Sequence, residues 1–174
     1  FINLHISFGI FKLRHICVFS INKLMELNKN LVFLGMMGSG KTTIGKIVSK
    51  KLNKKFIDID HQIELEENMT ISDIFQKKGE LFFRKIEEKI SLQNLKKSNS
   101  IISLGGGAFI NKKIQKEVLK NHISIWLRWD NKILISRIKN SYKRPIAIKL
   151  NDIDLNKLID DRSKIYSKAK YQIK

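Results

Sequence analysis

One segment of eight residues, GMMGSGKT at positions 35–42, constrains this chain more than any other. It matches the phosphate-loop pattern G-x-x-x-x-G-K-[ST], and it lies between an apolar run and a helical pattern, which is the context that such a loop requires. Glycines let the backbone turn its N–H groups inward as an anion nest, and the N-terminus of the following helix adds a positive dipole. The segment therefore predicts a binding site for a nucleoside triphosphate.

The side chains of this loop predict the cofactors ATP and Mg²⁺. The ammonium group of Lys41 is expected to contact the β- and γ-phosphates, and the hydroxyl of Thr42 is expected to ligate Mg²⁺. The residues of the loop expected to bind the nucleotide are Gly35, Gly38, Ser39, Gly40, Lys41, Thr42 and Thr43. The loop alone does not indicate which molecule receives the phosphate.

Short apolar runs alternate with longer helical patterns from Leu31 onwards. Strands are expected at 31–34, 56–58, 101–104, 123–127 and 171–173. Helices are expected at 42–52, 61–67, 70–78, 80–97, 111–120, 131–139 and 154–169. This alternation predicts an α/β fold with a parallel sheet of about five strands and helices on both faces. No apolar run approaches the roughly 20 residues of a membrane-spanning helix, so we expect no membrane partner.

Two carboxylates, Asp58 and Asp60, follow the second expected strand. Residues i and i+2 of a strand point the same way, so both side chains are expected on one side of the triphosphate site. Such a pair could organise a metal and deprotonate an acceptor hydroxyl. The equally weighted alternative is a pair of loop acids that cap the next helix.

The formal net charge of +18 raises the possibility of nucleic-acid binding. The chain is, however, rich in Ile, Asn and Lys, and only six of its 34 basic residues are arginine. We therefore interpret the lysines as solvated surface residues and nucleic acid as the less favoured partner, although the positive field would attract anionic substrates. Cys17 is the only cysteine, so no intramolecular disulfide can form, which fits a reducing compartment such as the cytoplasm.

The arginines are more informative because this chain otherwise favours lysine. A planar guanidinium grips a carboxylate or phosphate in two places, which an ammonium group does not do. The six arginines are Arg14, Arg84, Arg128, Arg137, Arg144 and Arg162.

Four segments occur in an order and spacing that resemble one family. They are the phosphate loop, FIDIDHQIE at 56–64, GELFFRKIE at 79–87 and SLGGG at 103–107. Together they resemble the shikimate kinase family over residues 30–173, and the third and fourth segments are far more specific than the phosphate loop. The resemblance implies a strand order like that of nucleoside monophosphate kinases. It also implies ATP-dependent phosphorylation of the 3-hydroxyl of shikimate, a step in aromatic amino acid (chorismate) biosynthesis.

On the acceptor side, the resemblance assigns roles to three side chains and one turn. Asp60 would hydrogen-bond the shikimate hydroxyls and accept the proton of the attacking 3-hydroxyl. Arg84 and Arg162 would hold the carboxylate of shikimate. Backbone amides would approach the substrate at the turn formed by Gly105, Gly106 and Gly107.

On the nucleotide side, the resemblance places Asp58 where it would organise Mg²⁺. Arg144 would close over the phosphates and, with Lys41, neutralise charge during transfer. Its segment, 140–151, is polar and contains the only proline, so a lid is expected there. Arg137 would stack near the adenine.

Each arginine also has a structural alternative. Arg84 could pair with Glu87 or Glu88 on a helix surface, and Arg162 could pair with Asp161. Arg128 has no role in the family pattern, and we interpret it as structural or stacked on a neighbouring tryptophan.

Residues 1–24 are basic and have no clean period. We expect either an extension upstream of a natural start at Met25 or a transit peptide for an organelle such as a plastid. Residues 25–174 are expected to form one kinase domain and to act as a monomer. The alternatives to shikimate as substrate are another small molecule such as gluconate, or a non-catalytic module that only binds nucleotide.

Overall fold

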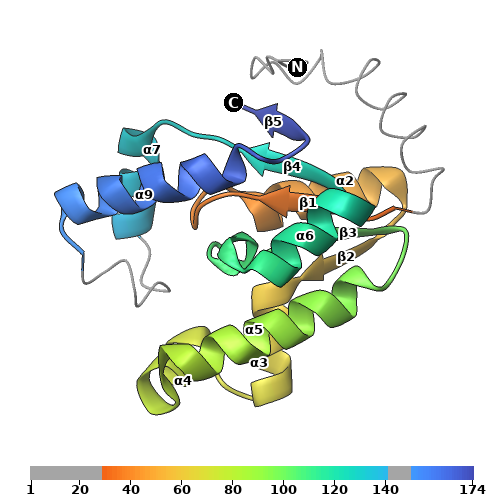
Figure 1. The fold of residues 1–174 in the computed structure, drawn as a ribbon, viewed down its shortest axis with the longest axis horizontal. Helices are drawn as coiled ribbons and strands as arrows, with labels where there is room; N and C mark the ends of the chain where they lie inside the picture. Colours follow the sequence, from red (N-terminus) through yellow and green to blue (C-terminus); the bar gives the residue numbers. More distant parts are fainter. Residues whose placement is uncertain (1–28, 141–149) are drawn as a thin grey trace.

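The computed structural model describes residues 29–140 and 150–174. Within these ranges, five strands form one parallel sheet in the order β2-β3-β1-β4-β5 (Figure 1). The strands are β1 (Leu31–Leu34), β2 (Lys55–Asp58), β3 (Ser100–Ser103), β4 (Ile123–Leu127) and β5 (Tyr171–Ile173). The five-stranded parallel sheet expected from the sequence is confirmed.

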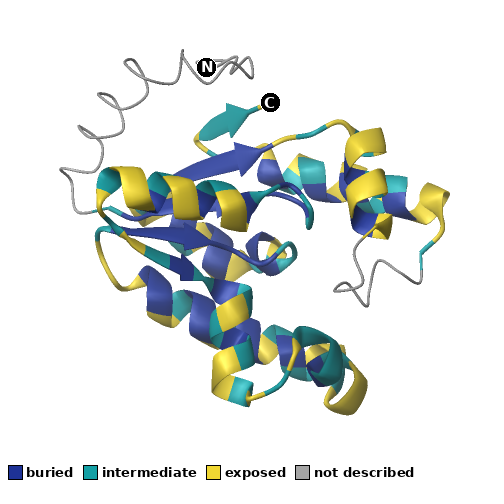
Figure 2. Cartoon of the chain, turned by 180° about the vertical axis from the view of Figure 1, so that it is seen from behind, coloured by how far each residue is buried: buried dark blue, intermediate teal, exposed yellow. Residues whose placement is uncertain are grey.

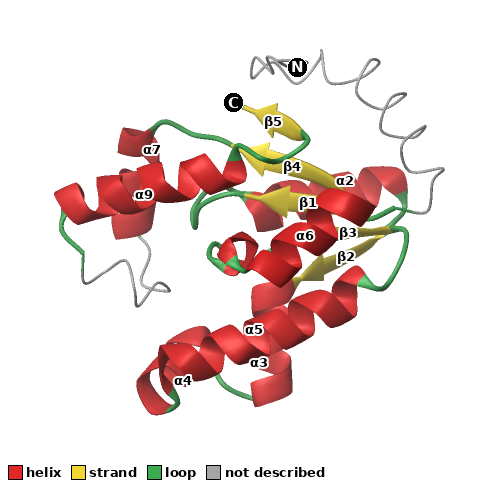
Figure 3. Cartoon of the chain, in the orientation of Figure 1, coloured by secondary structure: helices red, strands yellow, loops and turns green. Residues whose placement is uncertain are grey.

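Helices connect the strands and pack on both faces of the sheet (Figure 3). They are α2 (Lys41–Leu52), α3 (Ile59–Glu67), α4 (Ile71–Lys77), α5 (Gly79–Leu95), the 3-10 helix η2 (Ala108–Ile110), α6 (Lys112–Asn121), α7 (Asn131–Lys139) and α9 (Asp152–Tyr166). Most expected boundaries hold within two or three residues. The last helix differs most at its end, because α9 ends at Tyr166 and not at Ala169. None of the helices in the described ranges is long and apolar enough to cross a membrane.

The strands place alternate side chains in two separate apolar layers, as the pleat of a strand requires. Val32 and Leu34 belong to the large core that includes side chains of α5, α6 and α9. Leu31 and Phe33 belong to the smaller core on the other face, against which α2 packs Ile44 and its apolar neighbours. Figure 2 shows the outer side of α2 exposed, whereas the strands β1, β3 and β4 are buried and β5 is intermediate. Both faces of β1 are therefore covered, which explains its uninterrupted apolar sequence.

Local capping fixes where several helices begin. The Thr70 hydroxyl accepts a hydrogen bond from the Asp73 amide at 3.1 Å, which confirms the helix start expected there. Asp58 ends β2 and caps α3 by accepting from the amide of Asp60 at 3.1 Å. The chain therefore turns directly from strand into helix at this point.

The carboxyl ends of the parallel strands meet at one edge of the sheet. The phosphate loop follows β1, Asp58 and Asp60 follow or end β2, and the glycine turn follows β3. Ligands of open α/β sheets bind outside this edge, where strand order reverses. The fold thus gathers the segments singled out in the sequence, although they lie far apart along the chain.

Candidate active site

A cavity of about 450 Å³ lies at this edge of the sheet. Its walls come from the phosphate loop with the first turn of α2, the β2–α3 junction, the end of β3 with the glycine turn, and α7. The lining residues are Met37, Gly38, Gly40, Lys41, Thr42, Thr43, Asp58, Asp60, Ser103, Leu104, Gly106 and Arg137. Most of the predicted nucleotide residues and both predicted acids thus share one cavity.

The phosphate loop is held in a tight curl around the amine of Lys41. Gly40 has a φ of 86° and precedes the first residue of α2, so the helix N-terminus points into the cavity. The Nζ atom of Lys41 donates to the carbonyls of Gly35 and Met36, each at 2.9 Å. Gly35 and Ser39, which were also predicted to bind the nucleotide, do not line the cavity.

Two oxygen donors suitable for Mg²⁺ lie in contact on the cavity wall. The Thr42 hydroxyl donates to Asp58 Oδ2 at 2.6 Å. Magnesium bound with a nucleotide takes one or two protein oxygens and completes its shell with phosphate oxygens and water. No cluster of three or more His, Cys, Asp or Glu side chains that could hold a metal occurs in the described ranges. The Thr42–Asp58 pair therefore fits Mg²⁺ as a partner of the nucleotide and not as an all-protein site.

Asp60 reaches the cavity by a different route from the one expected. It lies in the first turn of α3, so the argument from strand alternation with Asp58 is wrong. The chain turns into a helix because Asp58 caps it, and both carboxylates nevertheless line the cavity. Burial, and then the charge of Asp58, raises the pKa of Asp60 to about 7, although Lys41 opposes this shift. A carboxyl group with such a pKa can exchange a proton near neutral pH.

The glycine turn lies close to side chains of α3 and α5, which side chains on the turn would displace. A Cβ atom on Gly105 would lie 2.6 Å from Asp60 Oδ1 and 2.7 Å from Glu87 Oε1. A Cβ atom on Gly107 would lie 2.5 Å from Arg84 Nη1. The triple glycine therefore allows the backbone to approach an aspartate, a glutamate and an arginine at van der Waals distance.

Arg84 is anchored by two glutamates of its own helix. Its Nη1 donates to Glu87 at 2.7 Å, and its Nε and Nη2 donate to Glu80 at 3.2 and 3.1 Å. Burial lowers the pKa of Arg84, but the carboxylates of Glu87 and Glu80 outweigh it and raise that pKa. The structural alternative of a pair with Glu87 is thus confirmed, whereas Glu88 contacts Asn111 and Lys113 instead.

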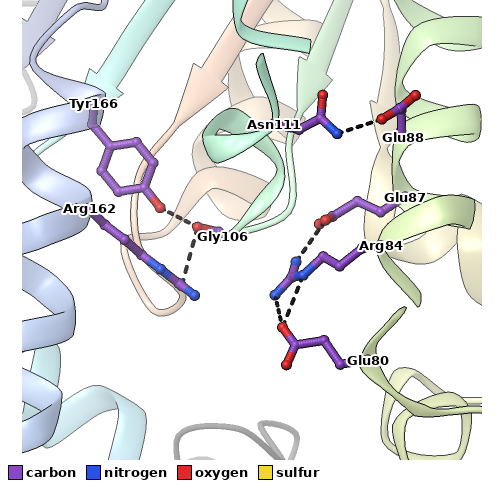
Figure 4. A network of polar contacts seen from close by, with 8 residues as sticks. All are labelled: Glu80, Arg84, Glu87, Glu88, Gly106, Asn111, Arg162 and Tyr166. Carbon is purple, nitrogen blue, oxygen red and sulfur yellow. Dashed lines mark hydrogen bonds and ion pairs between the residues drawn. The ribbon is translucent and has the colours of Figure 1, made fainter. Parts of the chain in front are cut away.

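Arg162 lies on the other side of the glycine turn and makes no hydrogen bond or close ion pair with a carboxylate of the described ranges, although its charge opposes the rise that burial causes in the pKa of Glu87. The residue is 6% exposed, its Nη1 donates to the Gly106 carbonyl at 3.4 Å, and its buried Nε has no hydrogen-bond partner among the described residues. Asp161, the partner considered from the sequence, pairs with Lys164 instead. Figure 4 shows Arg84 and Arg162 pointing toward one another from α5 and α9, on either side of Gly106.

Tyr166, which the sequence did not single out, shares this carbonyl. Its hydroxyl also donates to the carbonyl of Gly106 (Figure 4). The same hydroxyl contacts the sulfur of Met36 at 3.9 Å. Burial raises the pKa of Tyr166 to about 12, so the group remains a donor. The only signal in the sequence is the position four residues after Arg162, which places both side chains on one face of α9.

Arg137 lines the nucleotide side of the cavity and stacks on Trp129. Its guanidinium lies 4.0 Å from the centre of the indole, and its Nη1 donates to the Gly38 carbonyl at 3.4 Å. Arg128 lies over Trp126 at 5.5 Å, so its interpretation as a stacked residue is confirmed. Arg144, most of the expected lid 140–151 and residues 1–24 lie outside the described ranges.

Comparison with known proteins decides the family. The profile of the shikimate kinase family matches residues 37–174.

The chain belongs to the shikimate kinase family.

Among relatives, the shikimate kinase of Bartonella quintana (strain Toulouse) is 40% identical over 164 residues, which cover 92% of this chain and 78% of that protein. The shikimate kinase of Bacillus licheniformis is 43% identical over 145 residues and covers 80% of each chain.

Solved structures of shikimate kinases share the fold. The Acinetobacter baumannii enzyme in complex with shikimate has a TM-score of 0.81 at 28% identity, covering 87% of this chain and 86% of that one. The Aquifex aeolicus enzyme has a TM-score of 0.75 at 33% identity, with 83% and 86% coverage. A deoxyadenosine kinase at 19% identity has a TM-score of 0.54, which extends the likeness of fold to another kinase. The expected kinase architecture is thus confirmed.

Proposed function

We propose that this shikimate kinase family member transfers the γ-phosphoryl group of ATP to the 3-hydroxyl of shikimate. The observation that carries the proposal is the junction of two sites at Gly106. A Cβ atom there would lie 3.1 Å from the amide nitrogen of Met37 in the phosphate loop, while the carbonyl of Gly106 accepts from Arg162. The nucleotide loop and an arginine cluster suited to a carboxylate therefore meet at one residue.

The acceptor has a chemistry that this cluster suits. Shikimate carries one carboxylate and a set of hydroxyl groups on a rigid ring. Arg84 and Arg162 offer two guanidinium forks for the carboxylate, and Asp60 offers an acceptor for the hydroxyls. Glu87 keeps Arg84 in place through a 2.7 Å ion pair and is itself 3% exposed. The unpartnered Nε of Arg162 supports an anionic ligand at this position.

In the proposed reaction, the oxygen of the 3-hydroxyl forms a bond to the γ-phosphorus. The bond between that phosphorus and the bridging oxygen of ADP breaks, and the hydroxyl proton passes to Asp60. Phosphoryl transfer depends on alignment and charge neutralisation more than on covalent help from the protein. Lys41 and the helix N-terminus behind the loop supply positive charge next to the phosphates. We propose the same role for Arg144.

Mg²⁺ would be held by Thr42 and Asp58 and would neutralise charge on the phosphates. The Thr42 hydroxyl and the Asp58 carboxylate lie 2.6 Å apart and would separate to bind it. We further propose that the protein's excess positive charge attracts the two anionic substrates and does not serve nucleic acid.

The test is release of ADP by the full chain with Mg²⁺-ATP and shikimate, gluconate or no acceptor. Release that requires shikimate supports the proposal. Release with gluconate alone would keep the phosphate site and overturn the roles of Arg84 and Arg162. The Asp60→Asn variant should lose at least about a hundredfold in kcat, the usual contribution of a positioned proton acceptor, while retaining nucleotide binding. Near-normal turnover by that variant would exclude Asp60 as the proton acceptor.

A further inference from the structure

The carbonyl groups on the outer side of the phosphate loop are capped by side chains from elsewhere. A loop that turns its N–H groups inward necessarily turns its carbonyls outward, and a carbonyl removed from water needs a donor. Lys41 caps the carbonyls of Gly35 and Met36. The next two capped carbonyls, those of Gly38 and Ser39, accept from Arg137 and Trp129.

Trp129 makes the better defined of these two caps. Its indole Nε1 donates to the Ser39 carbonyl at 2.9 Å, across 90 residues of sequence. Ser39 is fully buried, so its backbone depends on donors from the protein. An indole N–H is donor only and rigid, which suits it to holding one carbonyl in one direction.

The same indole also positions Arg137. The guanidinium of Arg137 lies 4.0 Å from the ring centre, a distance typical of a stacked cation–π pair. The Asp130 side chain caps α7 directly after Trp129 by accepting from the Lys132 amide at 2.9 Å. Side chains on a helix lean toward its N-terminus, so Arg137, two turns into α7, reaches back over Trp129. Trp129 thus contacts the loop directly and also through Arg137.

We propose that Trp129 is a positioning residue for the nucleotide: it fixes the phosphate loop and Arg137, and thereby sets the affinity for ATP and ADP but not for the acceptor. The proposal rests on the proposed function only in assuming that nucleotide binds at the phosphate loop. The contacts of Trp129 with Ser39 and Arg137 both lie at the phosphate loop, so the affinity for the nucleotide should respond and the affinity for the acceptor should not.

The experiment measures the dissociation constant of Mg²⁺-ADP by calorimetry, together with both KM values, in the full chain. Trp129→Phe keeps an aromatic face for Arg137 and removes the N–H donor, and it should weaken Mg²⁺-ADP binding by about three- to tenfold, as expected for one lost hydrogen bond. Trp129→Leu removes the stacking face as well and should weaken it further. The KM for shikimate should change less than about twofold in both variants.

Arg128 offers a matched control, because it also stacks on a tryptophan, Trp126, and does not line the cavity. Arg128→Gln should leave the dissociation constant of Mg²⁺-ADP unchanged. If Trp129 acts partly through Arg137, the loss of binding free energy for Mg²⁺-ADP in the double variant Trp129→Leu/Arg137→Gln should be smaller than the sum of the losses in the two single variants. Intrinsic fluorescence should also change when Mg²⁺-ADP is added, and this change should vanish in Trp129→Phe although Trp126 remains.

Two outcomes would overturn the proposal. One is a folded Trp129→Leu protein, with near-native circular dichroism, that binds Mg²⁺-ADP as tightly as the unmodified chain. The other is an equal rise in KM for both substrates, which indicates general loosening of the site. Calorimetry measures binding without turnover. A chain that binds Mg²⁺-ADP but phosphorylates no acceptor would therefore refute the proposed function, and the binding constants of the Trp129 variants would still test this proposal.

Discussion

Phosphoryl transfer by this chain should weaken on acidification around pH 7, because Asp60 can accept a proton only as a carboxylate. Burial and the neighbouring Asp58 raise the pKa of Asp60 from its ordinary 3.8 to about 7. A single group with that pKa is roughly half ionised at pH 7, about one tenth at pH 6 and about one hundredth at pH 5. We therefore expect kcat/KM for shikimate to fall about tenfold per pH unit below pH 7.

The assay follows ADP release between pH 5 and 9, with Mg²⁺-ATP held well below its own KM so that the profile reports the enzyme before nucleotide binds. Asp58→Asn removes the negative charge that is the second cause of the raised pKa of Asp60. The acidic limb of the profile, which is the fall in kcat/KM at low pH, should therefore move to lower pH. The activity of this variant will also fall, because Asp58 is a proposed metal ligand, so only the position of the limb is compared. An Asn side chain can still cap α3.

Glu66→Gln is the matched control for this experiment. Glu66 lies on the same helix as Asp60 but pairs with Lys89 at 2.8 Å and is not among the groups that shift Asp60. Removing its charge should leave the limb where it is. A profile that is flat between pH 5 and 8, or a limb centred near pH 4, would refute the assignment of Asp60 as a proton acceptor with a raised pKa.

Three variants and one control test the site through stability and KM. Because the pKa of Asp60 is raised on folding, its stabilising contribution is full below about pH 4 and is lost as pH rises through about 7. Asp60→Asn should therefore raise the melting temperature of the nucleotide-free chain at pH 8 and change it little at pH 4; an equal change at both values would contradict the raised pKa. Gly107→Ala should raise the KM for shikimate by displacing Arg84, whose Nη1 would lie 2.5 Å from the new methyl group. Gly79→Ala is its control, because Gly79 has open space around it but a φ of 79°. This variant should lose roughly 1 kcal/mol of unfolding free energy, measured by urea unfolding, and should leave the KM for shikimate unchanged. Tyr166→Phe should lose about 1 kcal/mol of unfolding free energy with the hydroxyl's hydrogen bond and raise the KM for shikimate, and an unchanged KM would limit Tyr166 to a structural role.

The parts of the fold that could be predicted are those that local sequence determines. The phosphate loop combines a fixed motif with a strand before it and a helix after it. The buried strands β1, β3 and β4 appear as short apolar runs because both of their faces are covered. Gly79 falls between the helices expected at 70–78 and 80–97, and the structure gives it a φ of 79° at the start of α5.

The parts that could not be predicted depend on contacts between distant segments. Asp60 is the exception, because its position on a helix follows from capping by its near neighbour Asp58, an alternative that the sequence left open. Trp129 contacts Ser39 across 90 residues and Tyr166 contacts Gly106 across 60, so neither contact leaves a local pattern. Glu87 was considered only as a surface partner of Arg84, yet it is buried beside the glycine turn. Packing of α5, α7 and α9 around the sheet edge creates these contacts, and spacing along the chain does not encode them.

The central claim is that the site joined at Gly106 phosphorylates one particular hydroxyl of shikimate. The most direct measurement is phosphorus–proton NMR of the product formed by the full chain from Mg²⁺-ATP and shikimate. The account predicts a single phosphate coupled to the proton on carbon 3, with one ADP formed per product molecule. Phosphate on another oxygen, or ADP formed without any phosphorylated shikimate, would contradict it.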